Sequence, residues 1–195
     1  MSAPMIAAAV GMMVCCSSSV AAMMMGGGEE TPAAAAGAGA ATTPTGPTLP
    51  SAQYVKVERP TGAYPGNIVN LGEIEVFDKA GTNIALNAVV TGGPAAHGNG
   101  PFANLTDGDY ATIAHTAGDG IAFMTIDLGA VKEIAKIVIT NRAGYSGSTR
   151  MENATVKLLD ASQVDVKTTE AIVGEKMKMT YDFNVATPAW VYADA

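Results

Sequence analysis

The sequence predicts an all-β fold, a jelly-roll β-sandwich of about eight strands. Short runs rich in β-branched and aromatic residues recur after residue 51, and most alternate apolar with polar residues. Clusters of Gly, Pro, Asn and Asp separate these runs. No stretch of the domain shows the period of an amphipathic helix. This combination is typical of sandwiches and jelly rolls.

The first 28 residues form a separate segment, because they contain no charged side chain. Residues 3–28 are long enough to span a bilayer, which takes about 20 apolar residues. Ala7, Gly11, Cys15 and Ser19 fall on one helical face, in the small-residue pattern of packed membrane helices. A transmembrane helix is therefore expected, with a secretory signal peptide or an Ala/Met/Gly-rich tail as alternatives.

Residues 29–50 are a low-complexity linker of Ala, Gly, Thr and Pro, which cannot bury a core. We interpret the linker as a stalk, or alternatively as an extended arm lying across a neighbouring subunit. The β-sandwich domain is expected to cover residues 51–195.

The domain is expected to consist of short strands separated by loops and turns. The first ends at Pro60, and the Gly- and Pro-rich stretch 92–108 is expected to be mostly loop. Within Ile121–Arg142, two apolar runs are joined by a polar link containing Gly129, and a loop follows at 144–149. The expected strands cover 54–59, 71–78, 88–91, the two runs of 121–142, 155–160, 164–169 and 177–183.

The charge and cysteine patterns exclude several classes of function. The chain is acidic, with a net charge of −7, and has no basic stripe, which argues against nucleic acid and anionic lipid as partners. Both cysteines, Cys15 and Cys16, lie in the N-terminal segment, so the domain has neither disulfides nor thiolate ligands for zinc. No nucleophile–base set stands out, and the protein is not expected to be an enzyme.

Several strings in the domain resemble the discoidin family, the galactose-binding-like or coagulation-factor type C domains, which include fucose-binding lectins. The resemblance covers about residues 53–185. The strings are YVKVERP, NLGEIEVFDKAGTNIAL, LTDGD, MTIDLG, IVITNR and TVKLLDA. In the family, strands similar to the first two come last. Their position here implies a circularly permuted domain, in which the strand at 54–59 pairs with elements near the C-terminus.

The resemblance implies a calcium site. The matching positions are Asp107, Asp109, the carbonyl of Asn104, Thr112 and Glu73. Calcium takes 6–8 oxygen ligands and mixes carboxylates with carbonyls and hydroxyls, so these residue types suit it. The alternative is an Asp-Gly turn in which the side chain binds its own backbone.

The resemblance also implies a sugar site, formed in the fucose-binding branch by one His and two Arg. His115, Arg142 and Arg150 match that order. Relatives place a vicinal disulfide between the two arginines, whereas this chain has residues 143–148, in which Tyr145 offers a stacking face. The alternative is that Arg142 pairs with a loop acid while His115 is an exposed loop residue.

The CCSSS string followed by Met and Gly is similar to N-terminal segments of membrane proteins from large DNA viruses of algae and protists. This resemblance implies a minor capsid protein of a virion, anchored in the internal membrane and docked on other capsid proteins. The alternative is a calcium-dependent, glycan-binding attachment protein at a cell surface or in secreted form.

Overall fold

The computed structural model describes residues 46–194, apart from 61–66, 119, 144–149 and 174–175. These residues belong to one compact unit, Thr42–Ala195. The predicted membrane segment, with Ala7, Gly11, Cys15 and Ser19, lies outside the described residues. Among the residues that are described, no helix combines the length and hydrophobicity needed to cross a bilayer.

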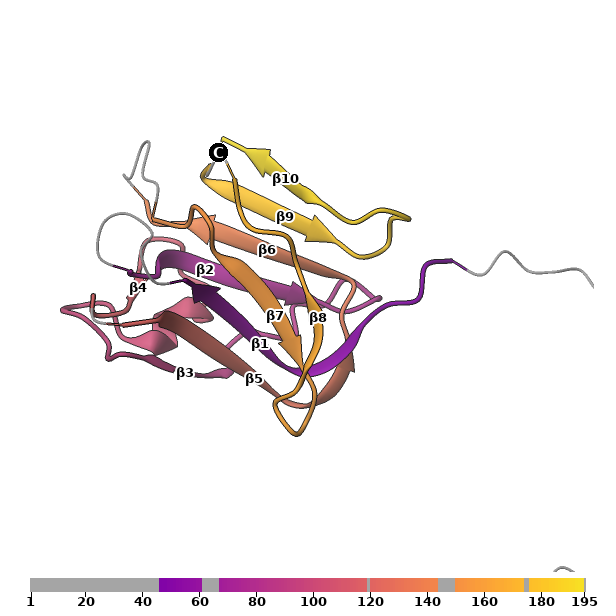
Figure 1. Ribbon diagram of the computed structural model, residues 1–195, viewed down its shortest axis with the longest axis horizontal. Coiled ribbons are helices and arrows are strands. Elements are labelled where there is room, and N and C mark those ends of the chain that lie inside the picture. Colours follow the sequence, from indigo (N-terminus) through magenta and orange to yellow (C-terminus); the bar gives the residue numbers. More distant parts are fainter. Residues whose placement is uncertain (1–45, 61–66, 119, 144–149, 174–175, 195) are drawn as a thin grey trace, which may run out of the picture. The chain divides into compact units, whose positions relative to one another are not determined.

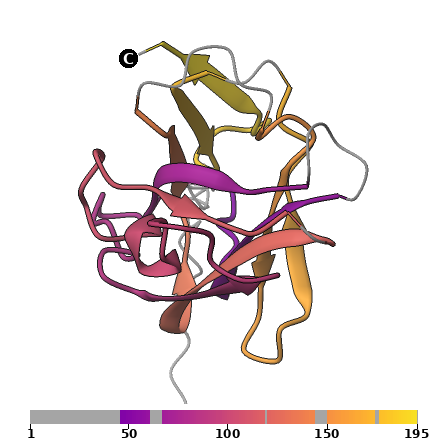
Figure 2. The ribbon, with the colours of Figure 1, turned by 90° about the vertical axis from the view of Figure 1, so that its left-hand side faces the viewer.

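The described part of the domain contains ten strands and one short 3-10 helix, which confirms the all-β class. The strands are β1 (Ser51–Arg59), β2 (Asn70–Phe77), β3 (Val89–Gly93), β4 (Ala114–His115), β5 (Ala122–Glu133), β6 (Lys136–Asn141), β7 (Thr155–Leu159), β8 (Asp165–Thr168), β9 (Lys178–Asp182) and β10 (Trp190–Ala193), and the 3-10 helix η1 is Phe102–Leu105. They form two antiparallel sheets, in the orders β3-β5-β1-β7-β8 and β10-β9-β6-β2-β4 (Figures 1 and 2).

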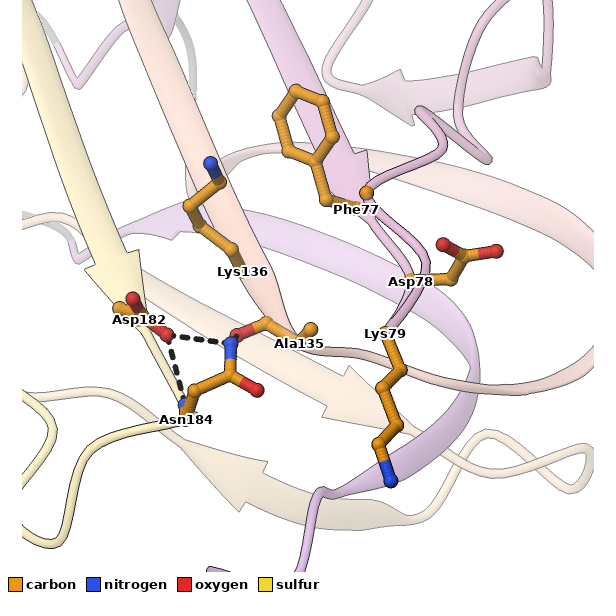
Figure 3. A pocket seen from close by; sticks show the side chains of 8 residues that line it. Phe77, Asp78, Lys79, Ala135, Lys136, Asp182 and Asn184 are labelled. Carbon is orange, nitrogen blue, oxygen red and sulfur yellow. Dashed lines mark hydrogen bonds between the residues drawn. The ribbon is translucent and has the colours of Figure 1, made fainter.

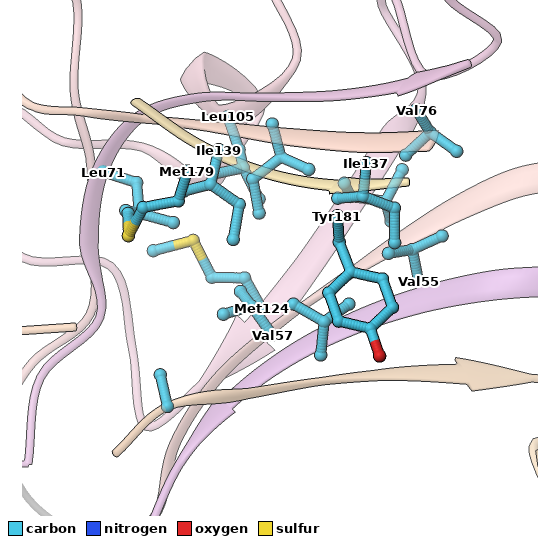
Figure 4. Packing of buried hydrophobic residues seen from close by; sticks show 14 of the residues in the cluster. Val55, Val57, Leu71, Val76, Leu105, Met124, Ile137, Ile139, Met179 and Tyr181 are labelled. Carbon is cyan, nitrogen blue, oxygen red and sulfur yellow. The ribbon is translucent and has the colours of Figure 1, made fainter. Parts of the chain in front are cut away.

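The core lies between the two sheets and follows from the alternation in the sequence (Figure 4). On β5, Met124 and Ile126 are fully buried, as Val55 and Val57 are on the neighbouring β1. The second sheet contributes apolar side chains of β2, β6 and β9, among them Ile139. Burying one such side chain contributes about 1.5–3 kcal/mol, so a Cys-free domain can rest on this core.

One expectation about strand pairing was wrong. β1 does not pair with elements near the C-terminus; it lies between β5 and β7 in the centre of its sheet. The two runs expected within Ile121–Arg142 are β5 and β6, and β5 extends through the polar link at Gly129 to Glu133, which pairs with Ser51. An irregularity absorbs the link: Asp127 Oδ1 accepts the Gly129 N–H at 2.8 Å, and Gly129 adopts a φ of 76°.

The sequence also left two strands unpredicted. β4 is a two-residue strand that pairs with the start of β2, at the edge of its sheet. β10 ends the second sheet and is tied to the loop before β9 by Glu170, which accepts the backbone N–H of Trp190 at 3.1 Å.

A β-bulge in β2 decides which side chains of this strand face the core between the sheets. Leu71 pairs with Asn141 and Glu73 with Thr140, so Gly72 is the additional residue. A Cβ on Gly72 would lie 3.0 Å from the Asn141 carbonyl oxygen, which favours glycine there. The bulge lets Leu71 and Ile74 both face the core, while Glu73 points to the opposite face.

The last residues of the linker pack against the domain. Leu49 is half-buried against the core, and the Pro50 carbonyl accepts the backbone N–H of Ile134 at 2.9 Å. Ile134 lies just before β6, so the chain enters at the end of the sandwich where β2 ends and β6 begins (right in Figure 1).

Candidate functional site

Adjacent strands bring three polar side chains together at the opposite end of the sandwich, which faces the viewer in Figure 2. Asn70, the first residue of β2, pairs with His115 of β4. Leu71 pairs with Asn141, the last residue of β6, so Arg142 follows beside Asn70. The Arg142 guanidinium donates from Nη1 to Asn70 Oδ1 at 3.4 Å. Strand register therefore assembles this group from residues distant in sequence.

The surroundings of His115 lower its pKa. Burial is the largest cause, electrostatic interactions with His97, Arg150 and Arg142 lower the pKa further, and the hydrogen bond with the His97 backbone opposes them. The rings of His97 and His115 meet edge to face, with centroids 4.9 Å apart and planes at 79°. We call Asn70, His97, His115, Arg142 and Arg150 the polar cluster. At neutral pH its His115 imidazole is uncharged and has one donor and one acceptor nitrogen.

Two buried groups of the polar cluster have no hydrogen-bond partner among the described residues. They are Asn70 Nδ2 and His115 Nε2, and Asn70 is only 1% exposed. Leaving a buried polar group unsatisfied costs about 1–3 kcal/mol, so such groups at the end of a sandwich suit a polar ligand. Tyr145, the expected stacking residue, lies outside the described residues.

The predicted calcium ligands gather in the acidic loop, residues 104–112. The Thr112 hydroxyl donates to Asp107 Oδ2 at 3.0 Å and also lies 2.9 Å from the Asp109 carbonyl. The Asn104 amide donates to the Ile113 carbonyl at 3.0 Å and closes the loop. Both Asp side chains also accept backbone N–H groups two residues on, at 2.9 Å, as in the alternative of a simple Asp-Gly turn.

Glu73 adds a carboxyl that a simple turn does not explain. It is completely buried beneath the acidic loop, and its Oε1 accepts the Gly108 N–H at 3.2 Å. Oε2 has no partner within the described residues. Burial raises the Glu73 pKa to about 7; the Gly108 bond opposes this, and the charges of Asp107, Glu75 and Asp109 add to it. A cation beside Oε2 would satisfy this oxygen and offset the three neighbouring charges.

The acidic loop fits calcium only if backbone and hydroxyl oxygens contribute. In the described part of the chain, no three His, Cys, Asp or Glu side chains stand close enough to hold a metal between them. Glu73, Asp107 and Thr112 would supply side-chain oxygens, and Asn104 and Asp109 their carbonyls. Mixed sets of this kind are usual for calcium, which accepts 6–8 oxygens in flexible geometry.

A shallow cavity of about 200 Å³ lies at the other end of the same strands (Figure 3). Its polar groups bond to one another: Asp182 Oδ1 accepts both the backbone and side-chain N–H groups of Asn184 at 2.8 Å. The Lys136 ammonium sits 4.5 Å from the centroid of the Phe77 ring. Three of the polar side chains that line this cavity, Lys136, Asp182 and Asn184, are thus engaged within the domain.

Sequence reasoning missed two members of the polar cluster, Asn70 and His97. Asn70 is the first residue of an otherwise apolar strand start, and its polar side chain at that position was the only sequence signal that it belongs to a site. His97 lies in a Gly- and Pro-rich stretch with no periodic pattern, so nothing in the sequence pointed to its pairing with His115.

A family model described as the NedA-like, galactose-binding domain matches residues 104–190. The matched segment contains the acidic loop and, from the polar cluster, His115, Arg142 and Arg150. The chain is thus similar to galactose-binding-like β-sandwich domains, in agreement with the discoidin-like fold expected from its strings. Comparisons with curated proteins and with solved structures gave no match.

Proposed function

We propose that the domain is a non-catalytic carbohydrate-binding module in which the polar cluster holds a saccharide and the acidic loop binds calcium. The observation that carries the proposal is a pair of buried groups, Asn70 Nδ2 and His115 Nε2, that have no hydrogen-bond partner in the described part of the chain and lie beside two arginine side chains. Sugar hydroxyls both donate and accept hydrogen bonds, so one saccharide can satisfy an amide and an imidazole together.

The order of the strands supports a circular permutation as part of this proposal. The segment that resembles galactose-binding domains begins at residue 104, after β1 and β2. Yet β1 is the central strand of its sheet, and β2 carries both Asn70 and Glu73. Three strands, β1, β2 and β3, precede the matched segment. The segment alone therefore lacks a complete sandwich, and β1 and β2 add a central strand and the side chains of Asn70 and Glu73.

The position of the polar cluster suits a binding module on a tether. The linker enters where β6 begins, and the polar cluster lies where β6 ends (Figure 1). The cluster therefore faces away from the point where the linker meets the domain. Anchoring in a virion membrane depends on residues 1–28, which lie outside the described residues, and stays a prediction. Docking on capsid proteins through the β-sandwich stays a prediction as well.

Binding of saccharides to the full-length protein in detergent tests the proposal. We expect galactose- or fucose-containing glycans on an array to bind in the presence of calcium and to bind more weakly in a chelator. Arg142→Ala should remove this binding. Lys136→Ala, which removes a cation at the opposite end of the same strand, should leave it unchanged. A blank array with folded, calcium-loaded protein would refute the proposal.

A further inference from the structure

The short turn at residues 95–100 holds His97 against the polar cluster through backbone hydrogen bonds. The His97 N–H donates to the His115 carbonyl at 2.9 Å, and the His115 N–H donates to the Gly100 carbonyl at 3.0 Å. The turn closes when the Gly100 N–H donates to the His97 carbonyl at 3.2 Å. These bonds involve only main-chain atoms, so the turn does not require an imidazole at position 97.

Two glycines bring this turn unusually close to β4. Gly98 has a φ of 57°, which a type II′ turn requires at its first central position. A Cβ on Gly100 would lie 2.7 Å from the His115 Cβ, too close for any other residue without movement. The backbone is thus adapted to place position 97 directly beside His115.

The His97 side chain is exposed at the rim of the polar cluster, next to the half-buried His115. Neither of its ring nitrogens bonds to a described residue. The fold therefore fixes the backbone of His97 but leaves its imidazole available to a ligand that reaches His115.

The polar cluster is rich in donors and poor in acceptors. Guanidinium groups only donate, and the Asn70 carbonyl oxygen already accepts from Arg142. A sugar hydroxyl that accepts from such groups still needs an acceptor for its own hydrogen. A neutral imidazole has one acceptor nitrogen, so the His97 ring adds a second acceptor to the one that His115 offers.

We propose that His97 is a further ligand-contacting residue of the saccharide site, which accepts a hydrogen bond from one hydroxyl and so determines which sugars bind. This inference rests on the proposed carbohydrate binding and names a neutral saccharide with a free hydroxyl as the ligand class. His97 thereby takes part in recognition through its side chain, in addition to the structural role of its backbone.

Titration of the full-length protein with galactose and with each monodeoxygalactose tests this inference. His97→Ala should weaken galactose binding by about three- to tenfold, the loss expected for one ordinary hydrogen bond. For the deoxy sugar that lacks the contacted hydroxyl, wild type and His97→Ala should bind equally. Asn99→Ala changes the same turn without altering the imidazole pair and should bind galactose as the wild type does.

Two further variants separate contact from positioning. His97→Phe keeps a ring edge against His115 but has no nitrogen, so it should bind as weakly as His97→Ala. His97→Gln restores an acceptor without a ring and should recover part of the affinity. Wild-type affinity in His97→Phe would overturn the contact, because it would show that the ring merely orients His115.

The results also distinguish this inference from the proposal on which it depends. Galactose binding that is the same in wild type and His97→Ala would overturn the role of His97 and leave carbohydrate binding intact. If folded wild-type protein bound no saccharide, the proposed function itself would fail, and the role of His97 with it. Unchanged thermal melting of His97→Ala should accompany the loss of affinity, because only main-chain atoms hold the turn.

Discussion

Replacing Glu73 by Gln should stabilise the calcium-free domain, by an amount that grows with pH. Glu73 is fully buried and its pKa is raised from 4.5 to about 7. A pKa raised this far corresponds to about 3 kcal/mol of destabilisation once the carboxyl ionises in the folded state. Gln keeps an acceptor for the Gly108 N–H but carries no charge.

The sign follows from the protons bound in each state. Below pH 4.5 the carboxyl is protonated in both the folded and the unfolded chain, so Glu73→Gln and wild type should differ little on this account. Between pH 4.5 and 7 only the folded state keeps the proton, and wild-type stability falls as pH rises. Above pH 7 the full penalty applies, and the variant should be more stable by about 3 kcal/mol.

Calcium should make the wild type more stable than Glu73→Gln, the reverse of their order without calcium. An ion that binds only the folded state stabilises it, and binding requires ionised Glu73, so the wild type should gain stability from calcium mainly at and above pH 7. Glu73→Gln should gain little. Glu75→Gln removes an equal charge two residues along β2 and should keep the calcium response.

Urea denaturation of the three proteins from pH 4.5 to 8, with calcium and with a chelator, gives the required free energies of unfolding. The difference in free energy of unfolding between Glu73→Gln and wild type reports the titration of Glu73 alone, because the other titratable groups are the same in both proteins. If this difference in free energy of unfolding did not vary with pH, the conclusion that Glu73 is buried with a raised pKa would be wrong. An equal calcium response in both proteins would remove Glu73 from the ligand set.

Three other expectations concern the rest of the domain. Burial and then the hydrogen bond to Glu170 raise the pKa of Tyr181 to about 12, so Glu170→Gln should lower it in a spectrophotometric titration. Met124→Ala removes a fully buried side chain and should cost about 2–5 kcal/mol in urea denaturation. Gly100→Ala places a Cβ against His115 and should cost about 1–3 kcal/mol while weakening saccharide binding in a calorimetric titration. If Met124→Ala or Gly100→Ala were as stable as the wild type, the close packing at that residue would be contradicted. An unchanged Tyr181 titration in Glu170→Gln would contradict the hydrogen bond between these two side chains.

The sequence predicted the sheets well because one face of each central strand is buried. Alternation along the first half of β5 and the second half of β2 marked core residues such as Met124 and Ile74, because side chains of a strand point to opposite faces in turn. The bulge at Gly72 breaks this period earlier in β2. It failed where pairing depends on neighbours: β4 has only two residues, and β10 is held by contacts with Glu170. Strand pairing joins residues that are far apart in the sequence, so no local pattern predicted that β1 lies between β5 and β7.

The candidate site was predictable in residue type but not in assembly. The strings resembling discoidin domains pointed to His115, Arg142 and Glu73, and the structure places the first two in one cluster and the third beneath the acidic loop. Asn70 joins the cluster only because β2 pairs with β4 and β6 together. His97 joins it through a turn that two glycines make possible.

The acidic loop and the polar cluster are parts of one structural unit. Asn70 and Glu73 lie on either side of the Gly72 bulge, so one strand carries a member of each site. The acidic loop that covers Glu73 leads within three residues to His115, whose backbone is bound to the 95–100 turn. An ion that fixed the loop against Glu73 would also fix the position of β4. Calcium would therefore strengthen saccharide binding by ordering His115, without touching the sugar, and the saccharide would strengthen calcium binding by the same factor.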